Sequence, residues 1–274
     1  NPGQNVYFRL TTLNAIQLLM QRRKFLHAAA AGTLGMTAAQ ATGAPLAPES
    51  IEERELIELR TYEMAFGGNR PLLLRYLQSA LEPAMRRAGV TQFYVFDELG
   101  KEDPKKYHVL IAYRDASAYL AAQDLDSDEE YSKAAKEYHA VKADRPIYSR
   151  FTSALLQAFS GMPKVEISSA EAKLFELRYY EGYSEDAVRR KIEMFNKEEI
   201  SLFLEVGLHP VFFGEMLAGP NRPNLVYMLH FKDMEERDAN WNVFRRHEEW
   251  NTMKDKPEYA NSVSNIRRVF LNMV

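Results

Sequence analysis

The sequence contains no cysteine among its 274 residues. This absence excludes disulfides, thiolate metal sites and cysteine nucleophiles. An excess of one charge sign is also missing, because 35 Lys and Arg residues stand against 38 Asp and Glu residues, for a formal net charge of −3. We therefore expect no nucleic-acid partner, since no broad basic field is available to attract a polyanion.

Several common signature motifs are absent as well. No glycine-rich dinucleotide loop, no phosphate-binding loop and no G-x-S-x-G elbow occurs in the sequence. The RRHEEW stretch at residues 245–250 differs from the H-E-x-x-H zinc motif, and no metal site is predicted there. What remains is a chain that is 46% hydrophobic, which is sufficient for a sizeable core.

The N-terminal region resembles a twin-arginine export signal. Arg22 and Arg23 precede a short, weakly apolar run, and Ala39 and Ala41 give an A-x-A cleavage pattern. We expect residues 1–41 to be removed, residues 42–54 to be a linker, and the protein to be periplasmic or extracellular. The apolar run is too short to remain as a membrane-spanning helix, so we expect no membrane span in the mature chain. The alternative is a plain disordered or helical tail.

One strand-like stretch occurs twice, as ELRTYE at residues 58–63 and as ELRYYE at residues 176–181. The offset is 176 − 58 = 118 residues. The same offset relates three further pairs of residues, namely Gly89 and Gly207, Asp115 and Asp233, and Arg150 and Arg268. A constant, domain-sized period indicates two tandem domains. We place them at residues 55–160 and 173–274, with a linker at residues 161–172.

Each half shows the same pattern of hydrophobic periodicity. The pattern predicts strands at 57–64, 90–99, 107–115 and 148–156, and at 174–183, 209–217, 225–233 and 266–274. Apolar residues at helical spacing follow the first and the third predicted strand of each half. Gly89 and Gly207 lie where the C-terminal caps of the helices after the first strands belong. The order βαββαβ is that of the ferredoxin-like unit, so the predicted class is α+β. Two such sheets would cover each other as a pseudo-dimeric α+β barrel, or pair with a second chain as a homo-oligomer.

This ordered set of elements resembles the NIPSNAP family of the dimeric α+β barrel superfamily. The resemblance rests on the ELRTY-type first strand, the glycine after the first helix, the third strand followed by Asp, and the Trp and Phe residues of the last helix. Its second copy is the closer match, because Trp241, Phe244 and Trp250 lie there. The family itself implies little about activity. Other dimeric α+β barrels include cofactor-free oxygenases, isomerases and haem-dependent enzymes.

The polar face of the repeated strand is the first candidate site. It consists of Glu58, Arg60, Tyr62, Glu176, Arg178 and Tyr180. We expect helices to cover the apolar face, so that these six side chains point into the barrel, where each Glu must pair with an Arg. Two interpretations remain open. The network holds the two sheets in register, or it lines a cavity that binds a small anionic or oxygen-bearing ligand.

The second candidate is a histidine that breaks the repeat. At the 118-residue offset His230 corresponds to Ala112, and His108 corresponds to Val226. We expect His230 to face the barrel interior and, together with Tyr180, to be the best candidate for proton transfer. No cofactor is predicted. Haem, with His230 as its axial ligand, is the alternative, and a hydrogen-bonded core histidine is the structural interpretation.

The sequence thus favours an exported small-molecule-binding or protein-interaction module. The alternative is an enzyme of the dimeric α+β barrel type with its site in the barrel interior.

Overall fold

The computed structural model describes residues 53–100 and 103–274. The predicted export signal and almost all of the predicted linker at 42–54 lie outside the described residues. The predictions about export therefore stay predictions.

The first half of the described chain alternates strands and helices. Its elements are β1 (Leu56–Met64), α2 (Arg70–Tyr76), η1 (Leu77–Leu81), α3 (Glu82–Arg87), β2 (Val90–Glu98), β3 (Lys106–Tyr113), α4 (Ala116–Ala121), α5 (Glu129–Ala134), α6 (Lys136–His139) and β4 (Tyr148–Ala158). The segments α2, η1 and α3 run on from one another, and η1 is a π-helical turn.

The second half has the same order of strands and helical regions. Its elements are β5 (Leu174–Glu181), α7 (Glu185–Met194), η2 (Phe195–Glu199), α8 (Ile200–Glu205), β6 (His209–Ala218), β7 (Asn224–Phe231), α9 (Met234–Arg246), α10 (Glu248–Lys254), η3 (Pro257–Tyr259) and β8 (Asn265–Met273). The π-helical turns η1 and η2 are themselves 195 − 77 = 118 residues apart.

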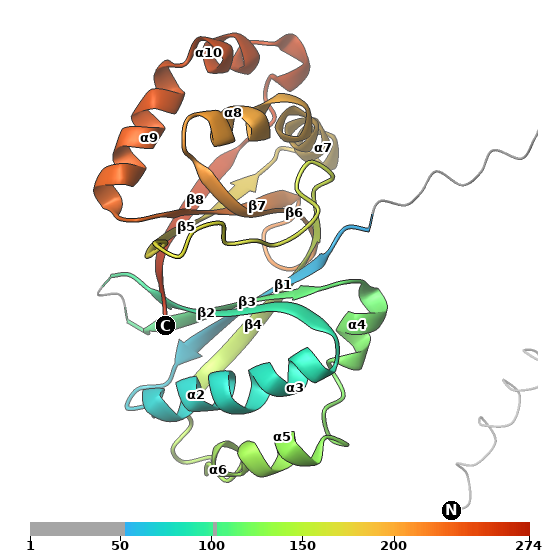
Figure 1. Cartoon of the computed structure of the whole chain (residues 1–274), viewed down its shortest axis with the longest axis vertical. Helices are drawn as coiled ribbons and strands as arrows, with labels where there is room; N and C mark the ends of the chain where they lie inside the picture. The colour runs from blue at the N-terminus through green and yellow to red at the C-terminus, as the bar shows by residue number, and fades with distance from the viewer. Residues whose placement is uncertain (1–52, 101–102) are drawn as a thin grey trace, which may run out of the picture. The chain divides into compact units, whose positions relative to one another are not determined.

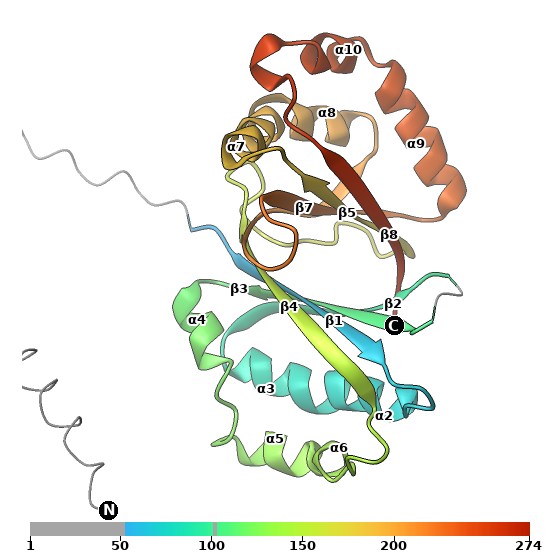
Figure 2. The same ribbon diagram turned by 180° about the vertical axis from the view of Figure 1, so that it is seen from behind.

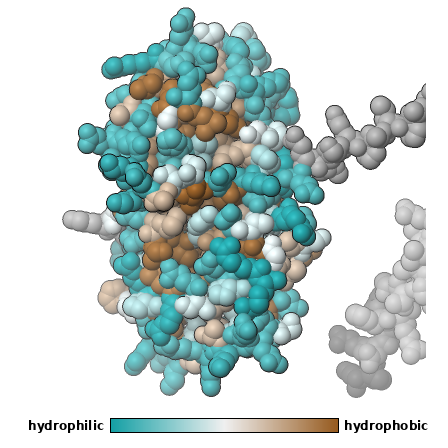
Figure 3. Space-filling model, viewed as in Figure 1, coloured by the Kyte–Doolittle hydropathy of each residue, from teal (hydrophilic) through white to brown (hydrophobic). Residues whose placement is uncertain are grey.

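In the described part of the chain, eight strands form one closed antiparallel barrel in the order β1-β3-β2-β8-β5-β7-β6-β4. Figures 1 and 2 show the strands in the middle, with α2 to α6 on one side and α7 to α10 on the other. The expectation of a mixed fold that forms a barrel is confirmed. On the side shown in Figure 3, hydrophilic side chains cover much of the surface and smaller apolar patches lie between them.

The two halves meet along two short ladders. The β2–β8 ladder pairs three residues, Phe96 to Glu98 with Met273 to Leu271, and the β4–β6 ladder runs from Leu155 to Ala158 on β4. By contrast, β1 pairs with β3 over eight residues, and β5 with β7 likewise. The barrel is therefore closed by a few backbone pairs together with its apolar interior.

Strand pairing tests the 118-residue offset residue by residue. Thr61 pairs with His108, and Tyr179 pairs with Val226, so the offset holds in the third strand of each half (226 − 108 = 118). In the last strand it changes, because Thr61 pairs with Thr152 while Tyr179 pairs with Arg267, and 267 − 152 = 115. Matching Arg150 with Arg268 was therefore wrong. The second half has three fewer residues between its last two strands.

Helix ends follow the capping signals in the sequence. The carboxylate of Asp115 accepts a hydrogen bond from the Ala118 amide, and that of Asp233 accepts one from the Glu236 amide. Both residues are N-caps. Gly89 has φ = +95° and Gly207 has φ = +75°, which are left-handed conformations that glycine adopts at helix ends without strain.

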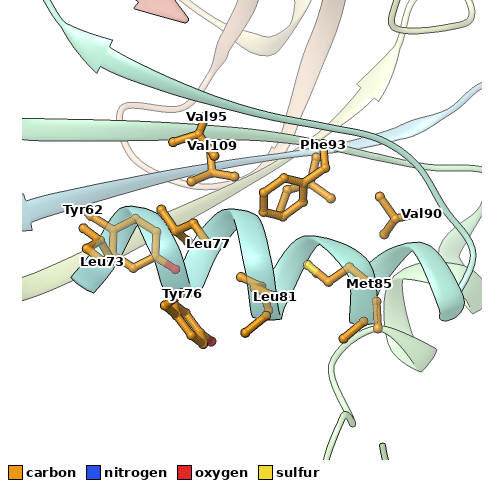
Figure 4. Packing of buried hydrophobic residues seen from close by; sticks show 14 of the residues in the cluster. Tyr62, Leu73, Tyr76, Leu77, Leu81, Met85, Val90, Phe93, Val95 and Val109 are labelled. Carbon is orange, nitrogen blue, oxygen red and sulfur yellow. The ribbon is translucent and has the colours of Figure 1, made fainter. Parts of the chain in front are cut away.

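Each half buries its helices against the outer face of its own strands. In the first half, Leu73, Leu77 and Leu81 pack against Phe93 and strand residues beside it (Figure 4). A second such cluster lies in the other half, around Phe195 and Phe203. Among the described residues, no helix has both the length and the apolarity needed to cross a bilayer.

Candidate functional site

The barrel interior contains residues from both halves. Its apolar centre comprises Ile57, Leu59, Phe96, Leu110, Ala112, Ala154, Leu156, Phe175, Leu177, Tyr179, Phe212, Val226, Met228 and Leu271, together with a few neighbours. Ile57 and Leu59 alternate along β1 with Glu58 and Arg60, so the apolar face of β1 points inward and its charged face points to the helices.

The expected direction of the Glu-Arg-Tyr face was therefore wrong. Tyr62 belongs to the cluster beneath the first helices and lies beside Leu73 and Tyr76 in Figure 4. Tyr180 belongs to the corresponding cluster of the second half. The reason is physical. The helix side offers hydrogen-bond partners to the charged groups, whereas the narrow barrel centre is filled by aliphatic and aromatic side chains.

In the first half, the charged face is held by four hydrogen bonds to Glu58. Arg60 donates from Nε and Nη2 to the two carboxylate oxygens at 2.7 and 3.0 Å. Tyr113 and Ser153 donate their hydroxyl protons to the same carboxylate, each at 2.6 Å. Burial alone would raise the pKa of Glu58, but the hydrogen bonds and charge of Arg60 outweigh it and hold this pKa below its usual value.

In the second half, Glu176 is fully buried and has two arginine partners. Arg178 Nη1 donates to it at 2.7 Å, and Arg237 on α9 donates through Nε and Nη2 at 2.9 Å each. The Trp241 indole donates at 2.9 Å. Tyr180 accepts from Arg178 at 3.2 Å. The expected pairing of Glu with Arg is thus present in both halves, and each network lies within its own half.

His230 faces the barrel interior, as its strand position predicted, but does not lie near the Tyr180 hydroxyl side of the sheet. Its Nε2 lies 2.9 Å from the Ser168 hydroxyl, and its ring stacks against His209 with the centroids 5.3 Å apart. Burial, and then the neighbouring His209, lower the pKa of His230 to about 4. The side chain is 2% exposed. This enclosed arrangement does not fit an axial haem ligand, and no joint site with Tyr180 forms.

A cavity of about 410 Å³ opens at the end of the barrel where β1 ends and β3 begins. Its wall is formed by Leu59, Thr61, Glu63, Glu98, Lys106, His108, Thr152, Ala154, Tyr179, Pro220, Arg267, Arg268 and Val269. Both halves contribute to this wall, and a volume of this size suits a small organic molecule.

Three polar side chains of the cavity form one hydrogen-bonded chain. The Thr61 hydroxyl lies 3.1 Å from His108 Nδ1, and His108 Nε2 lies 2.8 Å from Glu98 Oε2. Strand pairing fixes this arrangement, because His108 pairs with Thr61 on one side and with Phe96, two residues before Glu98, on the other. The hydrogen bond from His108 is the main cause that lowers the pKa of Glu98, against the opposing effect of burial.

Two cations of the cavity wall belong to the inner face, namely Lys106 and Arg267. Arg268 borders the cavity as well, but it pairs with Arg178 and so belongs to the face that meets the helices. The guanidinium of Arg267 lies over the Tyr179 ring, 3.9 Å from its centroid. Among residues 53–100 and 103–274, neither Lys106 nor Arg267 has a carboxylate oxygen within 4 Å, although both Glu63 and Glu98 line the cavity. A cavity with cations that lack carboxylate partners can accept an anionic group.

Sequence reasoning missed most of this site. The signal for His108 was present, since at the 118-residue offset it corresponds to Val226, in the same way that His230 corresponds to Ala112. Arg267 could not be placed, because the change of offset in the last strand put it on the inner face. Within the described residues, no group of three or more metal-binding side chains is placed to hold an ion.

Comparisons with known proteins support the fold and part of the family resemblance. Residues 175–274 match the NIPSNAP family model. The structure of a monooxygenase candidate from Fusobacterium nucleatum subsp. nucleatum matches with a TM-score of 0.54 and 12% sequence identity. The match covers 81% of this chain and 94% of the other. A monooxygenase candidate from Lactobacillus acidophilus gives the same values.

An uncharacterised NIPSNAP-like domain protein from Burkholderia xenovorans is 19% identical and covers 37% of this chain and 84% of its own, with a TM-score of 0.33. No curated protein is significantly similar in sequence. At 12% identity and a TM-score of 0.54, the two monooxygenase candidates show a shared fold and carry no activity with them.

Proposed function

We propose that this chain is a NIPSNAP-like barrel protein that binds a small anionic or oxygen-bearing molecule in the cavity beside His108. The observation that carries the proposal is the pair of inward-facing cations on the cavity wall, Lys106 and Arg267, neither of which has a carboxylate partner among the described residues. Arg267, stacked on Tyr179, is the anchor for the ligand's anionic group.

Tandem organisation belongs to the same proposal. We interpret residues 55–160 and 173–274 as two NIPSNAP-like units of ferredoxin-like topology. The repeated element order and the offset of 118 residues in the pairing of their third strands support this interpretation. The family match over residues 175–274 supports it for the second unit.

Export is the proposed localisation. It is supported by Arg22, Arg23 and the A-x-A pattern at Ala39 and Ala41. Determining the N-terminal residue of the protein purified from its native host tests this proposal, with a start shortly after Ala41 as the expected result.

The binding proposal predicts that small carboxylates and inorganic phosphate stabilise the protein through Arg267. Acetate, succinate, benzoate and phosphate are suitable probes for thermal shift and calorimetry. Replacing Arg267 by Ala removes a charge-assisted hydrogen bond of about 1.5–3 kcal/mol, so the Kd of a binding probe rises roughly tenfold or more. Arg246→Ala, at the exposed end of α9, is the matched control.

Two results would contradict this assignment. One is that none of the four probes shifts the melting temperature of the unaltered protein. The other is that Arg267→Ala and Arg246→Ala bind the successful probe equally well.

A second candidate function is an enzyme with its site in the barrel interior. The observation in its favour is the chain of hydrogen bonds from Thr61 through His108 to Glu98, because the side chains of a proton-transfer site are arranged in this way. Haem chemistry has no support in this site, since the two ring nitrogens of His108 are both engaged by side chains.

A further inference from the structure

The hydrogen bonds around His108 define the position of its proton. A carboxylate can only accept, so the contact of Glu98 with His108 Nε2 requires the proton on Nε2. Glu98 is in its carboxylate form at neutral pH, because the hydrogen bond from His108 lowers its pKa. In the neutral imidazole the free lone pair is then on Nδ1, and it faces the Thr61 hydroxyl at 3.1 Å. Thr61 therefore donates its proton to a base that a carboxylate holds in place.

This arrangement is the general pattern of an activated hydroxyl. A nucleophile, a base within hydrogen-bond reach, and a third group that orients the base are its three parts. Thr61 is partly exposed at the cavity wall, whereas His108 is 5% exposed. The hydroxyl is thus accessible to a molecule in the cavity, and the base behind it is shielded from solvent.

The cavity also contains groups that can stabilise negative charge. Lys106 and Arg267 line the same space as Thr61 and lack carboxylate partners among the described residues. A cation of this kind can either bind an anionic substituent of the ligand or stabilise the oxyanion that forms when a hydroxyl attacks a carbonyl. The charged groups that share the cavity with His108 are Glu63 from β1, Glu98 from β2, Lys106 from β3, and Arg267 and Arg268 from β8.

We propose that Thr61, His108 and Glu98 form an acyl-transfer site in which the Thr61 hydroxyl is the nucleophile. The substrate class is a small ester that bears an anionic group. This inference rests on the proposed function, because the ligand must first bind in the same cavity. Thr61 and His108 are its catalytic residues, and Glu98 is a positioning residue.

The reaction balances without a cofactor. Thr61 Oγ1 forms a bond to the ester carbonyl carbon while its proton passes to His108 Nδ1. The bond from that carbon to the alcohol oxygen then breaks, and the departing alkoxide takes the proton from His108. Water repeats the sequence on the acyl-threonine, which releases the carboxylic acid and restores the hydroxyl.

The sheet offers a matched control for Thr61. Thr152 pairs with Thr61 across the β1–β4 ladder and also faces the cavity, but among the described residues it has no hydrogen bond to a histidine. Both Thr61→Ala and Thr152→Ala remove a methyl and a hydroxyl group from the cavity wall, but only Thr61→Ala removes the proposed nucleophile. Thr61→Ser retains a hydroxyl at the reacting position.

The test uses 4-nitrophenyl hemisuccinate as the anionic ester and 4-nitrophenyl acetate as its uncharged counterpart. Acid-quenched protein is digested with trypsin and the acyl group is located by mass spectrometry. We expect it on the peptide of residues 61–75, since trypsin does not cleave between Arg70 and Pro71, in the unaltered protein and in Thr61→Ser, and not in Thr61→Ala. His108→Gln should slow nitrophenol release by about 10²-fold or more, and Thr61→Ala should slow it more than Thr152→Ala does. Arg246→Ala, outside the cavity, should slow it less than threefold.

The Glu98→Gln variant distinguishes a positioning role of Glu98 in catalysis from a purely structural role. An amide can donate to or accept from His108 Nε2, so the proton is no longer fixed on Nε2, and kcat for 4-nitrophenyl hemisuccinate should fall while its KM stays within threefold. An unchanged kcat in Glu98→Gln, an acyl group located on lysines alone, or equal rates for Thr61→Ala and the unaltered protein would each overturn the acyl-transfer site.

Binding of succinate, measured separately by calorimetry, distinguishes this failure from failure of the proposed function. If succinate binds and no ester is cleaved, the cavity is a binding site without acyl transfer. If succinate does not bind and no ester reacts, the assignment of the cavity as an anion site fails together with the acyl-transfer site.

Discussion

Both halves of the barrel hold a Glu-Arg network on the helix side of the sheet, but they differ in their other polar groups. At one end of the barrel interior, the first half contributes polar groups where the second half contributes apolar or aromatic ones. By strand pairing the corresponding residues are His108 and Val226, Thr61 and Tyr179, and Glu98 and Met216. Only one end of the barrel interior therefore contains the histidine, threonine and carboxylate of the candidate site.

Beneath the helices the difference is reversed. Leu73 and Leu81 of the first half are apolar core residues, and at the 118-residue offset the second half has Lys191 and Glu199. Lys191 Nζ donates to Glu199 at 2.6 Å, and both side chains are almost fully buried. The comparison teaches that this fold accepts buried charge in either layer, provided that partners lie within hydrogen-bond distance.

The largest effect is expected at Glu176. Glu176→Ala leaves the guanidinium groups of Arg178 and Arg237 buried without their common carboxylate, which should lower the free energy of unfolding by about 3–5 kcal/mol. Glu58→Ala leaves one arginine and should cost less. Urea denaturation of both variants at pH 7 measures the difference. An equal or smaller loss for Glu176→Ala would contradict the ranking.

The buried pair of Lys191 and Glu199 offers a second test, in which the second half is given the residues of the first. Lys191→Leu alone leaves a buried carboxylate unpaired and should destabilise the protein. The double variant Lys191→Leu/Glu199→Leu should be neutral or more stable by about 1–4 kcal/mol, because desolvation of two charges is avoided. A double-mutant cycle checks this. A double variant less stable than either single variant would show that the pair is a net stabilising interaction.

The smallest effect concerns His230 and pH. Its pKa is lowered to about 4 in the folded protein, so the unfolded chain binds a proton first as the pH falls. Stability is therefore fully present above about pH 6.5 and is lost between about pH 6.5 and 4, by up to about 3 kcal/mol.

The His230→Asn variant should lose less stability as the pH falls. Denaturation curves between pH 7 and 5 measure this difference, and this range lies above the one in which Glu58 and Glu176 titrate, because the pKa values of both are lowered. The groups near His230 are His209, Ser168 and Glu236, of which Glu236 opposes the shift. An identical pH dependence in the variant would show that the loss arises elsewhere.

Strand and helix order could be predicted from the sequence because local signals encode it. Alternation places every one of the eight strands near its observed bounds, and the two glycines lie at helix ends, whereas the division of the helical regions into several helices was not predicted. The inward face of β1 could not be predicted in this way. The alternation of side chains along β1 puts Leu59 and Arg60 on opposite faces of the sheet. Which of these faces meets the helices depends on Tyr113 and Ser153, which lie far along the chain.

The candidate site was hidden for a related reason. Glu98, His108 and Thr61 come from three strands, and only strand pairing brings them together. Arg267 lies on the inner face because the last strand of the second half is shifted by three residues relative to the repeat. A single sequence does not encode such a shift in any local pattern.

The chain that joins β4 to β5 has a consequence for how this barrel can change over time. In a symmetric dimer of identical subunits, every substitution in the shared interior occurs twice, related by the twofold axis. Here residues 159–173 connect the halves covalently, so their association is intramolecular and two short ladders suffice to close the ring. Each half is free to acquire a residue that the other lacks. The inward-facing residues of one half can therefore become specialised while those of the other half maintain the packing of the barrel interior.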